Sequence, residues 1–164
     1  MTGSPIVVVA GVGDGATELG AFDAALADAG LHNYNLVPLS SVVPPGRPVV
    51  TRDRFPPDRG LGVGDAVAVV LARGTAVGGD RVAAGLGWAT AAEGGVFFEA
   101  DGATEAECED DIAAELDGAR ARRDWDWREE GTRTAVHRAD RPAAAVVAAV
   151  FGPIELGGTA PAED

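Results

Sequence analysis

The order of the apolar segments limits the fold of this chain most strongly. A β-branched run at 5–10 predicts a buried strand, and the glycines at 11–15 predict a tight turn into a helix. Further extended segments are expected at 34–43, 66–73, 82–92, 95–99, 132–138 and 143–151. The later strands follow one another almost without crossover helices, so a doubly wound parallel sheet fits poorly. The sequence predicts a single α+β domain over 1–164, with helices covering the faces of its sheets.

Two segments have helical patterns. The first begins at Ala16 or Thr17 and ends at Gly30, where a left-handed residue is expected. Its predicted apolar face consists of Leu19, Phe22, Leu26 and Ala29. The second begins with a capping box at Thr104 and Glu107. Its predicted buried face consists of Cys108, Ile112, Leu116 and Ala119. The proline-rich stretch 44–65 is expected to be a long ordered loop or weak hairpin, and 157–164 a loose tail.

The composition excludes several function classes. All 13 basic residues are arginine, so no lysine is present for pyridoxal phosphate chemistry or for a Walker-type phosphate loop. A net charge of −13 argues against nucleic acid and anionic membranes as partners, and it suits cationic substrates or a high-salt environment. One cysteine and two histidines predict no disulfide and no metal site. No signal peptide or membrane span is recognised, so a cytoplasmic location is expected.

Two segments are candidates for a functional site. The glycines at 11–15 lie between a strand and a helix, as in a nucleotide-binding turn, but the fingerprint is incomplete and a structural turn is favoured. Ser40 and Ser41 end an apolar strand just before Pro44 and Pro45. These serines could simply cap backbone groups. Alternatively, the Ser41 hydroxyl could attack the preceding carbonyl in an N-to-O acyl shift, and elimination and hydrolysis would then leave a pyruvoyl group.

The segments 19–26 (LGAFDAAL) and 33–45 (NYNLVPLSSVVPP), with Gly30 between them, resemble the pyruvoyl-dependent arginine decarboxylases. The resemblance extends over about 5–155 and includes the GVFFE segment at 95–99. It implies an αββα four-layer sandwich of the pyruvoyl-dependent histidine/arginine decarboxylase type. It also implies autocatalytic cleavage between Ser40 and Ser41, which gives a β chain (1–40) and an α chain (41–164). The covalent cofactor would be pyruvate, as a pyruvoyl group made from Ser41.

The resemblance also implies roles for other residues. Asn35 would donate a hydrogen bond to a developing oxyanion, and Asp23 would bind the substrate guanidinium. Glu99 would protonate the substrate carbon, with Glu93 as the alternative. Glu99 is favoured because it is expected to end an apolar strand, where partial burial would raise its pKa.

The implied reaction converts L-arginine to agmatine and CO2, and agmatine would enter polyamine synthesis or another route. The implied assembly is a homotrimer of αβ protomers, or a hexamer, with sites between protomers. Two alternatives remain open at this point. The chain could be an unprocessed, non-catalytic homologue with a structural or regulatory role, or it could act on histidine or another cationic amino acid.

Overall fold

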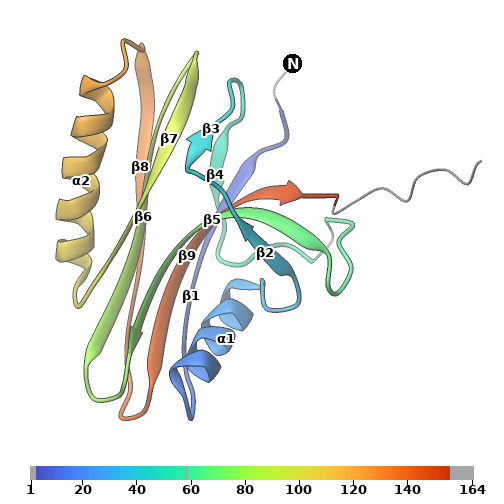
Figure 1. Ribbon diagram of the computed structural model, residues 1–164, viewed down its shortest axis with the longest axis vertical. Coiled ribbons are helices and arrows are strands. Elements are labelled where there is room, and N and C mark those ends of the chain that lie inside the picture. Colours follow the sequence, from blue (N-terminus) through green and yellow to red (C-terminus); the bar gives the residue numbers. More distant parts are fainter. Residues whose placement is uncertain (1–2, 58, 156–164) are drawn as a thin grey trace, which may run out of the picture.

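The computed structural model describes residues 3–57 and 59–155. Eleven elements follow one another in this part of the chain: β1 (Ile6–Asp14), α1 (Glu18–Ala29), β2 (Asn35–Pro38), β3 (Val42–Val43), β4 (Val49–Thr51), β5 (Ala66–Ala76), β6 (Arg81–Ala91), β7 (Gly94–Gly102), α2 (Glu105–Ala121), β8 (Trp127–Arg138) and β9 (Ala143–Pro153). The strands form two sheets, and each helix lies outside one of them (Figure 1). The predicted α+β class is confirmed.

The two sheets differ in their strand directions. The five-stranded sheet has the order β2-β5-β9-β1-β4, and the four-stranded sheet has the order β3-β7-β6-β8. In the first, β1 is antiparallel to β9 but parallel to β4, and β2 is parallel to β5. The four-stranded sheet is antiparallel throughout. The short strands β2 and β3 are therefore edge strands of different sheets, although only three residues separate them.

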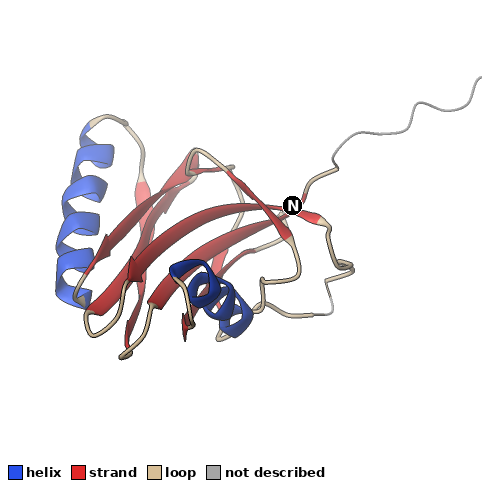
Figure 2. Cartoon of the chain, turned by 60° about the horizontal axis from the view of Figure 1, so that its bottom comes forward, coloured by secondary structure: helices blue, strands red, loops and turns tan. Residues whose placement is uncertain are grey.

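The buried side chains form three clusters, as expected for sheets that cover one another and carry helices outside (Figure 2). One cluster joins the facing strands of both sheets and includes Val147, Trp88 and Phe97. A second joins α1 to the five-stranded sheet, and a third joins α2 to the four-stranded sheet. Most apolar residues of β9 are fully buried because this strand lies in the middle of its sheet with a cluster on each face.

The glycines after the first apolar run are not a turn. Strand β1 continues through Gly11 and Gly13 to Asp14, although the sequence predicts a turn over 11–15. A Cβ atom at Gly11 would lie 2.2 Å from the Ala25 carbonyl oxygen, and one at Gly13 would lie 2.5 Å from the Ala25 nitrogen. The glycines therefore allow α1 to pack directly against the backbone of β1. This close packing explains the glycine pattern without a bound phosphate.

The same close packing changes the buried face of α1. Thr17 is the N-cap and Gly30 ends the helix with a φ of 82°, both as predicted. The buried residues are Ala21, Ala25, Leu26 and Ala29. Leu19, which was assigned to the buried face, is 71 % exposed. Small side chains form this interface because larger ones would not fit between a helix and a glycine-bearing strand at this distance.

Helix α2 matches its sequence pattern closely. Thr104 and Glu107 form the predicted capping box. Cys108, Ile112 and Leu116 are buried, as is Ala119. Strand β8 begins at Trp127, five residues earlier than predicted, and the 44–65 segment contains one short strand, β4. The predicted loose tail at 157–164 lies outside the described residues. Neither of the two helices in the described part of the chain is long and apolar enough to span a membrane.

Candidate active site

The chain crosses from one sheet to the other at residues 39–41. Before the crossing, the Leu39 amide donates a 2.8 Å hydrogen bond to the Val69 carbonyl of β5. After it, the Phe97 amide of β7 donates a 2.8 Å hydrogen bond to the Ser41 carbonyl. The two hydrogen bonds fix the backbone on both sides of Ser40. The Ser40–Ser41 peptide bond therefore spans two independently held sheet edges.

Ser41 has an unusual backbone conformation. Its φ is +67°, and it is the one non-glycine residue with positive φ within 3–57 and 59–155. A left-handed conformation at a residue with a side chain costs about 1–3 kcal/mol and persists only where the surroundings impose it. Here the two sheet edges impose it. Strain of this kind is typical of functional positions.

Glu99 is the carboxylate that contacts Ser41. The Ser41 hydroxyl Oγ donates to Glu99 Oε1 at 3.3 Å. The contact follows from the strand register, because Val42 pairs with Val96 and Val43 pairs with Gly95. Glu99 thus comes from the interior of β7, three residues before its end at Gly102, and its side chain is exposed. This corrects the expectation that Glu99 ends the strand in a partly buried position.

Glu93 lies in the turn between β6 and β7, and its side chain is exposed. Within the described residues no hydrogen bond joins it to either serine. In the structure Glu99, and not Glu93, is therefore the carboxylate hydrogen-bonded to the Ser41 hydroxyl.

Asn35 begins β2 on the same strand that leads to the serines. Its side-chain nitrogen Nδ2 donates to the Gly64 carbonyl at 2.7 Å, and its backbone amide donates to the Asp65 carbonyl at 2.9 Å. The side-chain bond ties β2 to the loop before β5 and uses one of the two amide hydrogens. Within the described residues no hydrogen bond joins Asn35 to Ser41.

Asp23 projects from the middle of α1, and its side chain is exposed. No ion pair or side-chain hydrogen bond is formed by Asp23 within the described part of the chain. Its neighbour Phe22 stacks against Arg73, whose guanidinium carbon lies 3.9 Å from the ring centroid. The structure therefore brings Ser41 and Glu99 together in one chain, and within the described residues no hydrogen bond or ion pair joins Asp23 to either of them.

Two glycines that the sequence analysis did not assign to the site control the position of β3. A Cβ atom at Gly94 would lie 2.9 Å from the Val43 carbonyl oxygen, and the residue has a φ of +146°. A Cβ atom at Gly95 would lie 2.7 Å from the Ala89 oxygen and 3.1 Å from the Val43 Cβ. The pair allows β3 to approach β7 closely. The consecutive glycines at the start of a strand were the signal in the sequence.

Comparison with known proteins identifies the family. A family model described as pyruvoyl-dependent arginine decarboxylase matches residues 5–156. A pyruvoyl-dependent arginine decarboxylase of Halobacterium salinarum is 42 % identical over 146 residues, which cover 87 % of this chain and 90 % of the relative. One from Pyrococcus abyssi is 32 % identical over 155 residues, with coverage of 90 % and 94 %. The chain belongs to the pyruvoyl-dependent arginine decarboxylase family, as its sequence predicted.

Proposed function

We propose that this chain cleaves itself between Ser40 and Ser41 and then converts L-arginine to agmatine and CO2. Cleavage gives a β chain of residues 1–40 and an α chain of residues 41–164 that begins with a pyruvoyl group. The observation that carries the proposal is the strained Ser41, held between two sheet edges with its hydroxyl 3.3 Å from the Glu99 carboxylate. Family membership supports an enzyme that depends on this cofactor.

The residues around Ser41 suit the cleavage reaction. Glu99 accepts the proton of the Ser41 hydroxyl as Oγ attacks the Ser40 carbonyl carbon. The bond from that carbon to the Ser41 nitrogen breaks, an ester forms, and the nitrogen becomes an amine. Loss of the Ser41 α-proton then breaks the Cβ–Oγ bond and leaves a Ser40 carboxylate. Water converts the remaining unsaturated amine to the pyruvoyl group and ammonia.

Asn35 has a supporting role in this proposal. Gly64 occupies one hydrogen of its side-chain amide, and the second remains for the oxyanion that develops on the Ser40 carbonyl. Five residues of extended backbone, about 16 Å, separate Asn35 from Ser40 within one chain, so the proposed donor to this oxyanion is the Asn35 amide of a neighbouring protomer.

Decarboxylation uses the same carboxylate in a second role. When formed, the pyruvoyl group supplies the electron-accepting carbonyl that pyridoxal phosphate provides in other decarboxylases. Glu99 holds the proton that is delivered to the substrate α-carbon as CO2 departs. Its position on a regular strand fixes the carboxylate relative to Ser41, because the register of β7 against β3 sets their separation.

The guanidinium of the substrate requires an anionic partner near Ser41. Within the described residues of one chain, no hydrogen bond or ion pair joins Asp23 to Ser41. We propose that Asp23 of a neighbouring protomer binds the guanidinium by paired hydrogen bonds. Apolar side chains exposed near both features support an assembled site: Leu19 is 71 % exposed beside Asp23, and Val42 is 56 % exposed beside Ser41. The proposed assembly is a cytoplasmic homotrimer, or a hexamer, of the family's four-layer sandwich.

A denaturing gel of the purified protein tests self-cleavage. We expect two bands, because the 40 residues before Ser41 are about a quarter of the 164-residue chain. Ser41→Ala is expected to leave one full-length band and no agmatine release. Thr75→Ala is the matched control: it also deletes an exposed hydroxyl, that of Thr75 in β5, and this variant should cleave normally. A wild-type chain that stays intact after long incubation would instead indicate an unprocessed homologue.

The substrate is tested separately with the cleaved protein. Agmatine release from arginine is compared with amine release from a panel that includes histidine and ornithine. We expect arginine to be preferred because a carboxylate binds a planar guanidinium through two parallel hydrogen bonds. Preference for another amino acid would refute the substrate while leaving self-cleavage intact.

A further inference from the structure

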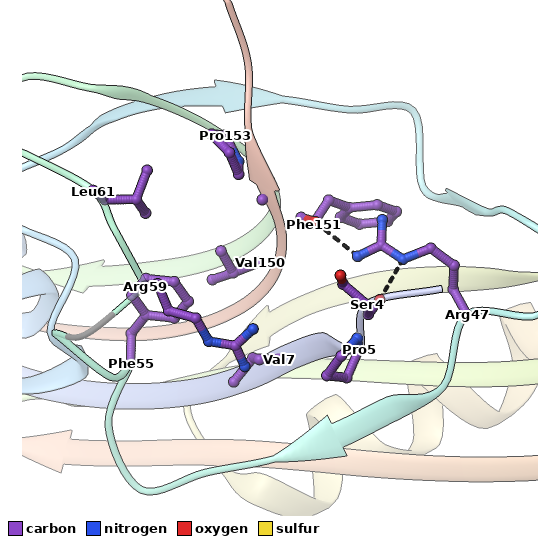
Figure 3. A pocket seen from close by; sticks show the side chains of 11 residues that line it. Ser4, Pro5, Val7, Arg47, Phe55, Arg59, Leu61, Val150, Phe151 and Pro153 are labelled. Carbon is purple, nitrogen blue, oxygen red and sulfur yellow. Dashed lines mark hydrogen bonds between the residues drawn. The ribbon is translucent and has the colours of Figure 1, made fainter. Parts of the chain in front are cut away.

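A cavity of about 380 Å³ lies beside the beginning of β1 and the end of β9 and does not include Ser41 or Glu99 (Figure 3). Its walls come from β1, β9 and the loops on either side of β4, and they combine polar groups with the apolar side chains of Val7, Phe55, Leu61 and Val150. Two arginines, Arg47 and Arg59, also line it. The size is that of a small-molecule site, and the mixture of apolar walls with a few polar groups is typical of one.

Arg47 is a half-buried cation held in place by neutral groups. Its Nε donates to the Ser4 carbonyl at 2.6 Å, and its Nη2 donates to the Phe151 carbonyl at 2.8 Å. The guanidinium carbon also lies 5.9 Å from the centre of the Phe151 ring. Burial lowers the pKa of Arg47, which shows that the surroundings disfavour its charge. Within the described residues no carboxylate lies within 4.0 Å of this guanidinium.

The charge around the cavity contrasts with that of the chain as a whole. The protein has 26 acidic residues and a net charge of −13, yet the described residues that line this cavity include two arginines and no carboxylate. Figure 3 shows Arg47 and Arg59 on different sides of the space. A half-buried cation is ordinarily paired, because burial of an uncompensated charge is costly. Among the described residues that line the cavity, no anionic group is paired with Arg47.

We propose that this cavity binds a small carboxylate that carries an apolar body. Guanidinium groups bind carboxylates through parallel hydrogen bonds, and Arg47 has free N–H groups after its two carbonyl contacts. The side chains of Phe55, Leu61 and Val150 would contact the apolar body. These walls favour an organic carboxylate over phosphate or another fully hydrated anion. The inference is independent of the proposed decarboxylation, since none of the proposed catalytic residues lines the cavity.

Benzoate is a suitable probe, and benzamide is its neutral counterpart of nearly the same shape. Each is titrated into the purified protein, with both polypeptides present, at one fixed chloride concentration, and the backbone amide NMR signals of Phe55 and Gly152 are followed. We expect saturable shifts with benzoate and at least about tenfold weaker binding of benzamide. Arg59→Gln is expected to weaken benzoate binding about tenfold or more, in line with loss of one charge-assisted hydrogen bond. Arg81→Gln, an exposed arginine outside the cavity, is the control and should bind as wild type.

Arg47→Gln provides a second variant, because Arg47 also ties the N-terminal segment to β9. Thermal melting is measured alongside it so that loss of binding in a folded protein is separated from unfolding. Equal binding of benzoate and benzamide, or unchanged benzoate affinity in folded Arg47→Gln and Arg59→Gln, would overturn the proposal. Shifts that appear at Arg81 rather than at Phe55 and Gly152 would overturn it as well.

Discussion

Replacement of Glu99 by glutamine would remove the proposed proton carrier while it preserves the shape of the site. Glutamine retains the length of glutamate and can still form a hydrogen bond with the Ser41 hydroxyl, but it has no proton to exchange with the substrate. At 3.3 Å the Ser41–Glu99 contact is longer than a typical O–H···O bond, so it contributes little to positioning in the resting protein. The side chain is exposed, so the folding free energy should change by no more than about 0.5 kcal/mol.

The expected loss is therefore chemical. A positioned general acid or base contributes about 10²- to 10⁴-fold, or roughly 3–5 kcal/mol of barrier height. We expect Glu99→Gln to lower kcat for agmatine release by at least about 100-fold and to slow self-cleavage as well. Agmatine release is measured per mole of cleaved α chain, quantified on the same gel, so that the two effects are separated.

Glu93→Gln makes the same chemical change six residues away, in the turn between β6 and β7. Since Glu93 does not contact Ser41 in the structure, its replacement is expected to change kcat less than about twofold. Retention of kcat within about tenfold by Glu99→Gln would refute the assignment. A large loss in Glu93→Gln with normal Glu99→Gln would move the role to Glu93.

Three further predictions concern the fold. Gly11→Ala should lower the free energy of unfolding in urea by about 3 kcal/mol, because the new Cβ would lie 2.2 Å from the Ala25 oxygen. An unchanged urea midpoint would contradict the close packing of α1 against β1. Arg141 and, less strongly, His137 hold the pKa of Asp14 below its ordinary value. Ionised Asp14 therefore stabilises the folded state at neutral pH, and this contribution to the free energy of unfolding should disappear as pH falls below about 4. Asp14→Asn should remove this part of the pH dependence of urea unfolding. Raising NaCl from about 0.15 M to 2 M should raise Tm by screening the net charge of −13, whereas a falling Tm would argue against self-repulsion.

The elements that the sequence predicted best are those with strong local signals. Helix α2 carries its capping residues and its buried face within one segment, so neighbours along the chain determine both. The prediction of a turn at the glycines of β1 was wrong because these glycines are required by the close approach of α1. That contact joins two different elements and leaves no local pattern in the sequence. Leu19 was placed in the core for the related reason that helical periodicity does not reveal how closely the helix approaches the sheet.

The candidate site was predicted by resemblance rather than by periodicity. The two serines and Asn35 lie in one contiguous block, whereas the contact of Ser41 with Glu99 joins residues 58 positions apart and depends on the pairing of a two-residue strand. No local pattern predicts such a pairing. The same limit applies to the position of β3, which depends on Gly94 and Gly95. Within the described chain no hydrogen bond or ion pair joins Asn35 or Asp23 to Ser41.

The sheet crossing at residues 39–41 would also determine how the two polypeptides of the proposed cleavage stay together. The short polypeptide would keep β1, α1 and β2, and both of its strands belong to the five-stranded sheet, with β1 between β9 and β4. The long polypeptide would keep its pyruvoyl end at the edge of the other sheet, next to β3. The pieces would remain interlocked without a covalent link, and the torsional strain at Ser41 could relax. Folding would then be a one-time event, because a denatured, processed molecule would have to reassemble from two chains in a concentration-dependent encounter.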